Sequence, residues 1–97
     1  MQYNFEWDPG KATSNSSKHG ITFEEAVAVF KDPMALSLYE GEDSAPGEDR
    51  WITLGLVSDR RYIVVVHTYQ PSSSSITIRV ISARRATQHE IKQYEQG

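Results

Sequence analysis

Two groups of residues in this sequence carry side chains that transfer protons or bind phosphate. The first group lies near the N-terminus and consists of Lys11, Lys18 and His19. The second group lies further along the chain and consists of Glu48, Arg50, Arg79, Arg84 and Arg85. Imidazole, ammonium and carboxylate groups exchange protons, whereas guanidinium groups match the geometry of a phosphate and keep their charge. The two groups together favour acid–base chemistry at a phosphate, with arginines stabilising the charge that develops.

The histidines each have a structural explanation as well. His19 precedes Gly20, a residue typical of helix ends, where a cation interacts favourably with the helix dipole. His67 lies in the middle of a β-rich segment and is expected to be a hydrogen-bonded residue of the sheet, whereas His89 is expected to be solvated. No His-x-x-x-His pair or acidic pair has the spacing of metal ligands, so we expect no metal site and no cofactor.

A short strand and a helix are expected to position the N-terminal group. Residues 3–7 alternate between apolar and polar side chains, which indicates a strand. Asp8 is a good N-cap and the proline after it suits the first helical position, so a polar helix is predicted over residues 11–17. Gly20 would end this helix in the left-handed conformation.

A second helix is predicted directly after the first. Thr22 and Glu25 have the spacing of a capping box, and apolar residues recur at helical spacing as far as Phe30. Asp32 precedes a proline, which disfavours the α conformation at Asp32 and therefore ends the helix.

The rest of the sequence is predicted to be mostly sheet. The expected strands cover residues 34–39, 50–57, 62–69 and 76–83. The connections are an acidic loop over residues 40–48, a hairpin at residues 58–61 and a serine-rich loop over residues 70–75. Thr87 and Glu90 form another capping box, which begins a last helix that ends near Glu95.

These elements predict an α+β fold for a single domain over residues 1–97. Its sheet has four to five strands and is mostly antiparallel, and two N-terminal helices and one C-terminal helix pack against it. Both faces of the strands at 62–69 and 76–83 carry apolar side chains, although helices are expected on only one. The second apolar face suggests a protein partner, unless it reflects only the frequency of valine and isoleucine in strands.

Charge is distributed unevenly along the chain, whose formal net charge is −3 at pH 7. Five of the 13 acidic residues lie between positions 40 and 49, whereas the segment after Ile76 contains several arginines. A basic surface is therefore compatible with a net acidic protein. Disulfides are excluded because there is no cysteine, and no segment resembles a membrane span or a signal peptide. We therefore expect a bacterial cytoplasmic location and no membrane contact.

Several motifs occur in the order and spacing of a known family. They are Phe5-Glu6-Trp7-Asp8-Pro9 followed by Lys11 and Asn15, the run from Lys18-His19-Gly20 to Ala26, Asp32-Pro33, Glu48-x-Arg50, Gly55-Leu56, and the run from Arg79 to Thr87 followed by Glu90 and Tyr94. Over residues 5–95 the sequence resembles the BrnT family, the toxin component of bacterial type II toxin–antitoxin pairs.

The resemblance implies an endoribonuclease that cleaves RNA without a metal ion, on a fold similar to that of the RelE-type toxins. In such cleavage the adjacent 2′-hydroxyl attacks the phosphate, which requires a base, an acid and a cation. The catalytic candidates are Lys11, His19, Glu48, Arg50 and Arg84, and the substrate-binding candidates are Lys18, Arg79, Arg85 and Tyr94. Tyr94 has an alternative role, in which it anchors the last helix.

The resemblance also implies a partner, a BrnA-like antitoxin with a ribbon-helix-helix domain. Such an antitoxin would neutralise the toxin, connect it indirectly to DNA and allow a dimeric toxin–antitoxin complex. Two other functions remain open. A catalytically degenerate toxin fold would act through partner binding alone. A regulator would bind nucleic acid directly, although the sequence has no helix-turn-helix signature.

Overall fold

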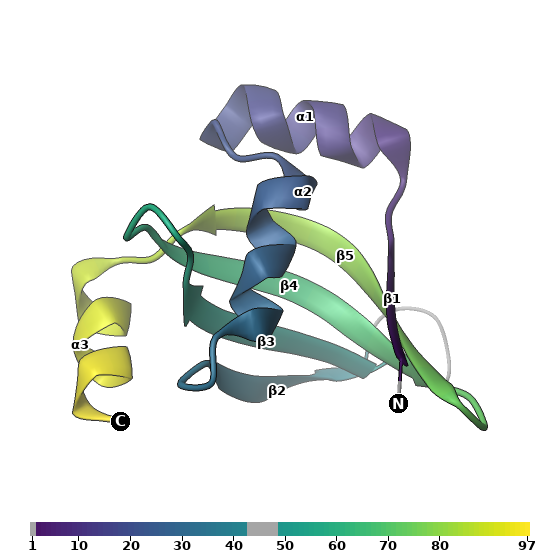
Figure 1. The fold of residues 1–97 in the computed structure, drawn as a ribbon. Helices are drawn as coiled ribbons and strands as arrows, with labels where there is room; N and C mark the ends of the chain where they lie inside the picture. Colours follow the sequence, from purple (N-terminus) through teal and green to yellow (C-terminus); the bar gives the residue numbers. More distant parts are fainter. Residues whose placement is uncertain (1, 43–48) are drawn as a thin grey trace.

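The computed structural model describes residues 2–42 and 49–97 (Figure 1). Its elements are β1 (Gln2–Glu6), α1 (Pro9–His19), α2 (Phe23–Ala26), the 3-10 helix η1 (Val27–Lys31), β2 (Leu36–Glu42), β3 (Asp49–Leu56), β4 (Tyr62–Pro71), β5 (Ser75–Arg85) and α3 (Gln88–Gln96). The predicted acidic loop lies largely outside the described residues, as does Glu48. β2 starts later than predicted and continues to Glu42, because a bulge before Gly41 lets it stay paired with β3.

The strands form one mixed sheet in the order β1-β5-β4-β3-β2. Three of the four pairings are antiparallel, as predicted, whereas β1 lies parallel to β5. The predicted serine-rich loop is shorter than expected, because β4 runs to Pro71 and β5 starts at Ser75. The N–H of Ser72 donates to the Ser75 carbonyl at 2.8 Å and closes this tight connection.

Asp8 and Gly20 cap the two ends of α1, as predicted. The helix itself is longer than its serine content led us to expect. The Asp8 carboxylate accepts a hydrogen bond from the Lys11 N–H at 2.9 Å, and Pro9 occupies the first turn. Gly20 adopts φ 69°, and its N–H donates to the Ser16 carbonyl at 2.8 Å. Together these caps support a helix that runs from Pro9 to His19.

The second predicted helix is confirmed at its start and differs at its end. The capping box between Thr22 and Glu25 is present. From Val27 onward, however, the chain tightens into a 3-10 helix, which a short valine-containing stretch tolerates more easily than a full α-helix. Asp32 has extended dihedral angles and ends this segment, as the following proline predicts.

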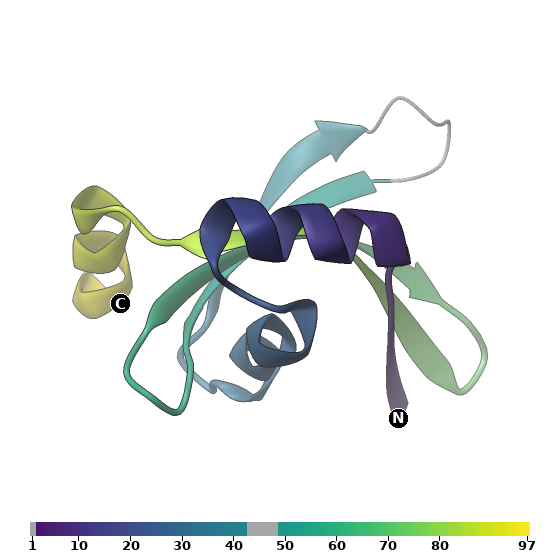
Figure 2. The same cartoon turned by 90° about the horizontal axis from the view of Figure 1, so that it is seen from above.

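Helices α2 and η1 cover one face of the sheet. Their Phe23 and Val29 side chains are fully buried with Val65 of β4 and Val80 of β5. In Figure 2 this segment lies on one side of the sheet, while α1 lies along β5 and α3 stands at the end where β5 stops. The prediction that helices pack on one face of the sheet is thus confirmed for α2 and η1. We call the opposite face of the sheet the open face.

Among the described residues, no helix combines the length and the hydropathy that a membrane span requires.

Candidate functional site

Asn15 fixes α1 against β5. Its side-chain Nδ2 donates to the carbonyl oxygens of Ala83 at 2.9 Å and Ile21 at 3.2 Å, and its Oδ1 accepts from the Ala83 N–H at 3.0 Å. The two bonds with Ala83 satisfy buried backbone groups of β5 beyond Arg79, where the pairing with β1 ends. This role of Asn15 was not predictable from the sequence, where Asn15 stands out only as part of a motif, because a polar residue in a serine-rich helix gives no periodic signal.

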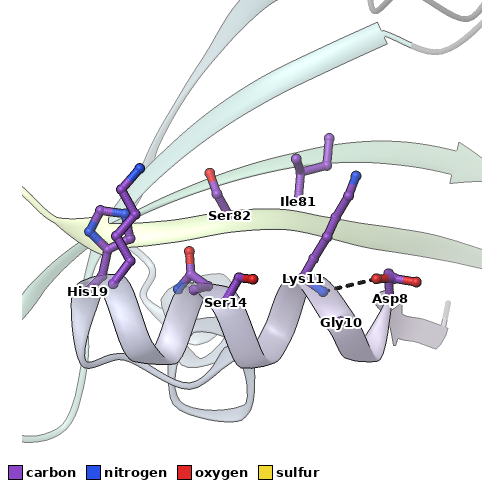
Figure 3. A pocket seen from close by; sticks show the side chains of 9 residues that line it. Asp8, Gly10, Lys11, Ser14, His19, Ile81 and Ser82 are labelled. Carbon is purple, nitrogen blue, oxygen red and sulfur yellow. Dashed lines mark hydrogen bonds between the residues drawn. The ribbon is translucent and has the colours of Figure 1, made fainter.

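A cleft of about 540 Å³ lies between α1 and β5 (Figure 3). It is lined by Asp8, Gly10, Lys11, Ser14, Asn15, Lys18, His19, Ile81 and Ser82. Lys11, Asn15 and Lys18 are four and three residues apart, so they lie on the same face of α1. The structure therefore brings together three of the predicted site residues, Lys11, Lys18 and His19, and all three are exposed.

A bulge in β5 shapes the other wall of the cleft. Val66 pairs with Ser82 and His67 pairs with Val80, so Ile81 is an extra residue on β5. Ile81 and Ser82 consequently point to the same side, which is also the side toward which Lys11 extends (Figure 3). The pairing of Ser82 with Val66 places its hydroxyl on the open face of the sheet, so the cleft and the open face are continuous.

Three of the predicted arginines share the open face. Arg50 and Arg79 both pair with Thr68, one from each side, and Arg84 pairs with Val64. Directly paired residues project to the same face, so these guanidinium groups lie on the same side of the sheet as Ser82. Arg85 pairs with Ile63, which belongs to the core under the helices, so Arg85 projects to the opposite side.

Two of these arginines bind carboxylates of the chain itself. Arg79 contacts Glu6 at 3.2 Å, and Arg84 donates to both carboxylate oxygens of Glu90 at 2.9 and 3.0 Å. The Arg84 guanidinium outweighs the effect of partial burial and lowers the pKa of Glu90 to about 2, and the same pair raises the pKa of Arg84. Glu90 also closes the predicted capping box with Thr87.

The contacts of Tyr94 support its alternative role as an anchor. Its hydroxyl donates to Asp32 Oδ2 at 2.6 Å, and its ring packs edge-on against Tyr62. The bond to Asp32 raises the pKa of Tyr94 to about 12. Burial opposes ionisation of Asp32, but hydrogen bonds from the Leu56 N–H, the Tyr94 hydroxyl and the Met34 N–H lower its pKa. Tyr94 thus ties α3 to the end of η1.

His67 is a hydrogen-bonded residue of the sheet, as predicted. It is fully buried, its Nε2 lies 2.6 Å from Thr53 Oγ1, and its ring packs edge-on against Phe30 and Tyr69. Burial lowers the pKa of His67 to about 4, so the ring is neutral at physiological pH. His89 is exposed on α3, which also agrees with the prediction.

The described residues contain no group of three histidine, aspartate or glutamate side chains placed to hold a metal ion. A comparison with curated proteins finds no match. A family model described as the ribonuclease toxin BrnT of type II toxin–antitoxin systems matches residues 7–90, which include α1, the cleft and all of β5. The family implies an RNA target and an antitoxin partner. The chain therefore belongs to the BrnT family of ribonuclease toxins.

Proposed function

We propose that this chain is an endoribonuclease that cleaves RNA at the cleft between α1 and β5 without a metal ion. The observation that carries the proposal is the convergence of Lys11, Lys18 and His19 on one cleft that opens onto a face bearing arginines. Phosphate groups bind to such cationic surfaces, and exposed side chains leave room for a strand of RNA.

The cleft contains the groups that cleavage by the 2′-hydroxyl requires. In the proposal His19 removes the proton of the attacking 2′-hydroxyl, Lys11 protonates the leaving 5′-oxygen, and the ammonium group of Lys18 stabilises the charge on the phosphate. Two ammonium groups supply here the positive charge that a metal ion supplies in other nucleases. The products of this reaction are a 2′,3′-cyclic phosphate and a 5′-hydroxyl end.

The remaining candidates take supporting roles in the proposal. Arg50 and Arg79 hold the RNA backbone on the open face, and Arg84 acts there once its contact with Glu90 opens. Glu48 stays a candidate base from its sequence position. Arg85 and Tyr94 contribute to substrate binding only where RNA extends past the end of β5.

The proposal extends to the fold family and the partner. A mixed sheet with α2 and η1 on one face supports a RelE-like ribonuclease, and the open face, which α3 contacts through Arg84 and Tyr62 at one end, supports an antitoxin that covers the rest of it. We propose a BrnA-like ribbon-helix-helix antitoxin as that partner. It would link the toxin to DNA and form a dimeric complex in the bacterial cytoplasm, where the RNA substrate is.

One observation favours the second candidate, a toxin fold that acts through partner binding alone. Arg79 and Arg84 are both neutralised by carboxylates of the same chain, which reduces the attraction of the open face for RNA. Under this candidate the cleft would bind an antitoxin without cleaving RNA.

Induced expression in a bacterial host separates the two candidates. The wild-type chain, Lys11→Ala, His19→Gln and the matched control His89→Gln would be compared for growth, RNA integrity and the chemistry of the RNA ends. We expect arrest and 2′,3′-cyclic phosphate ends with the wild type and the control, and a loss of roughly 10²-fold or more in cleavage with His19→Gln. Normal growth with intact RNA at confirmed soluble levels would favour the binding module.

A further inference from the structure

β2 forms one edge of the sheet. Within the described residues it pairs with β3 on one side only. Edge strands can accept another strand, and proteins commonly protect them with lysine, proline or a bulge. From Leu36 to Tyr39 the strand has none of these, because its bulge occurs only between Tyr39 and Gly41. In the part of the chain that the structure describes, this stretch of the edge is regular and has no second strand paired to it.

The same segment exposes large apolar side chains on both faces of the sheet. Leu38 is 67 % exposed and lies on the open face beside Ile52, whereas Tyr39 is 53 % exposed and packs against Trp51 on the other face. A strand added along this edge would extend the row of side chains on each face of the sheet. Its successive side chains would lie beside Leu38 on one face and beside Tyr39 on the other.

The two faces of the edge differ in charge. On the Tyr39 side, the tyrosine hydroxyl donates to Asp49 Oδ1 at 3.2 Å, so a carboxylate lies next to the exposed ring. A ring and a carboxylate together attract a cation. A second copy of this strand could not provide one, because β2 contains no lysine or arginine. On the Leu38 side the directly paired neighbour is the apolar Ile52. The charged neighbour on that face is the cationic Arg50, which pairs with the glycine of β2.

We propose that the β2 edge is the docking site for an extended segment of a partner protein in which apolar and basic residues alternate. The segment joins the sheet beside β2, with apolar side chains next to Leu38 and basic side chains next to Tyr39 and Asp49. That the partner is the antitoxin rests on the proposed function. β2 and β5 are separated by β3 and β4, so the segment docked at this edge does not itself reach the α1–β5 cleft, which is left to other parts of the partner (Figure 1).

A short synthetic peptide of alternating valine and lysine tests the docking site on the full-length protein, with a valine–glutamate peptide as its counterpart. We expect the lysine peptide to slow amide hydrogen exchange in β2. We expect the glutamate peptide to bind at least about tenfold more weakly. Leu38→Lys, which places a charge on the exposed edge, should weaken binding by a similar factor. The matched control Tyr3→Lys changes a residue that is 56 % exposed on the opposite edge strand and should leave binding unchanged.

Several outcomes would overturn the proposal. They are no binding of the lysine peptide, equal binding of both peptides, and protection from exchange at β1 or the open face instead of β2. Self-association that Leu38→Lys abolishes would assign the edge to a second copy and would also overturn it. Lys11→Ala should keep peptide binding whatever happens to RNA cleavage. A failure of the docking site can therefore be distinguished from a failure of the ribonuclease proposal.

Discussion

The side-chain amide of Asn15 makes the two hydrogen bonds with the backbone of Ala83 that a neighbouring strand would otherwise make. It donates to the Ala83 carbonyl at 2.9 Å and accepts from the Ala83 N–H at 3.0 Å, so both backbone groups of that residue are satisfied. β1 pairs with β5 only as far as Arg79, and α1 covers the edge beyond that point. One buried amide therefore sets the position of the cations on α1 relative to Ser82.

We predict that Asn15→Ala destabilises the fold by about 3 kcal/mol, because the buried N–H and carbonyl of Ala83 lose their partners. Asn15→Asp should be no better, because a carboxylate cannot donate to the carbonyls of Ala83 and Ile21. Denaturant unfolding measures the loss, and Ser17→Ala, an exposed position on the same helix, is the control. Equal midpoints for Asn15→Ala and Ser17→Ala would contradict this account.

The local features of the fold were predictable from the sequence. The caps at Asp8, Gly20, Thr22 and Thr87 form where expected, because each depends on hydrogen bonds between residues only a few positions apart. The hairpin between β3 and β4 was predictable for the same reason, because it joins two strands that are close in the sequence.

Features that depend on distant residues were not predictable. The parallel pairing of β1 with β5 and the bond between Asn15 and Ala83 join residues about 70 positions apart, and no periodicity connects them. The Arg84–Glu90 pair was missed for another reason. Capping explained Glu90 adequately, although its Oε1 accepts from both the Thr87 N–H and Arg84 while its Oε2 accepts a second bond from Arg84. The cationic candidates were therefore predictable from the sequence, whereas their neutralisation by carboxylates of the same chain was not.

His67 should make the free energy of unfolding depend on pH. Its folded-state pKa of about 4 lies below the ordinary 6.5, so the unfolded chain takes up the proton first. The stability is fully present above pH 6.5 and is lost as the pH falls toward 4, by about 3 kcal/mol in total. We predict that His67→Gln flattens this dependence between pH 6.5 and 5, above the range where carboxylates titrate. His89→Gln, an exposed histidine, should leave the slope unchanged, and a slope that persists in His67→Gln would refute the assignment.

Gly55 should tolerate no side chain, because β3 and η1 approach closely there. A Cβ at this position would lie 2.8 Å from the Val29 Cβ, and Val29 is fully buried and cannot move aside. We predict that Gly55→Ala lowers the free energy of unfolding by about 1–3 kcal/mol. Gly10→Ala is the control, because a Cβ there would lie 3.1 Å from the exposed carboxylate of Asp8 and not against a buried side chain, and alanine favours the helix. A thermal unfolding midpoint for Gly55→Ala at or above that of Gly10→Ala would show that the sheet can shift away.

The pair formed by Arg84 and Glu90 makes a simple alanine substitution at Arg84 ambiguous. Arg84→Ala removes a cation from the open face and also leaves the Glu90 carboxylate without its main partner. Because the Arg84 side chain is 39 % exposed, solvent screening limits the pair to about 1 kcal/mol. Part of any lost activity could then come from a loosened α3.

Glu90→Gln separates these effects, because glutamine preserves the capping box with Thr87 while it releases the guanidinium group. We predict that both variants lose a similar, small amount of stability, and that RNA cleavage falls in Arg84→Ala but is kept or increased in Glu90→Gln. The two should be compared in RNA cleavage and in denaturant unfolding, together with the double variant. The lowered pKa of Glu90 contributes to the free energy of unfolding, and this contribution is fully present above pH 4.5 and is lost as the pH falls toward 2. The stability of Glu90→Gln should therefore be compared with that of the wild type at neutral pH. Equal loss of cleavage in both variants would mean that Arg84 positions α3 and does not act on the phosphate.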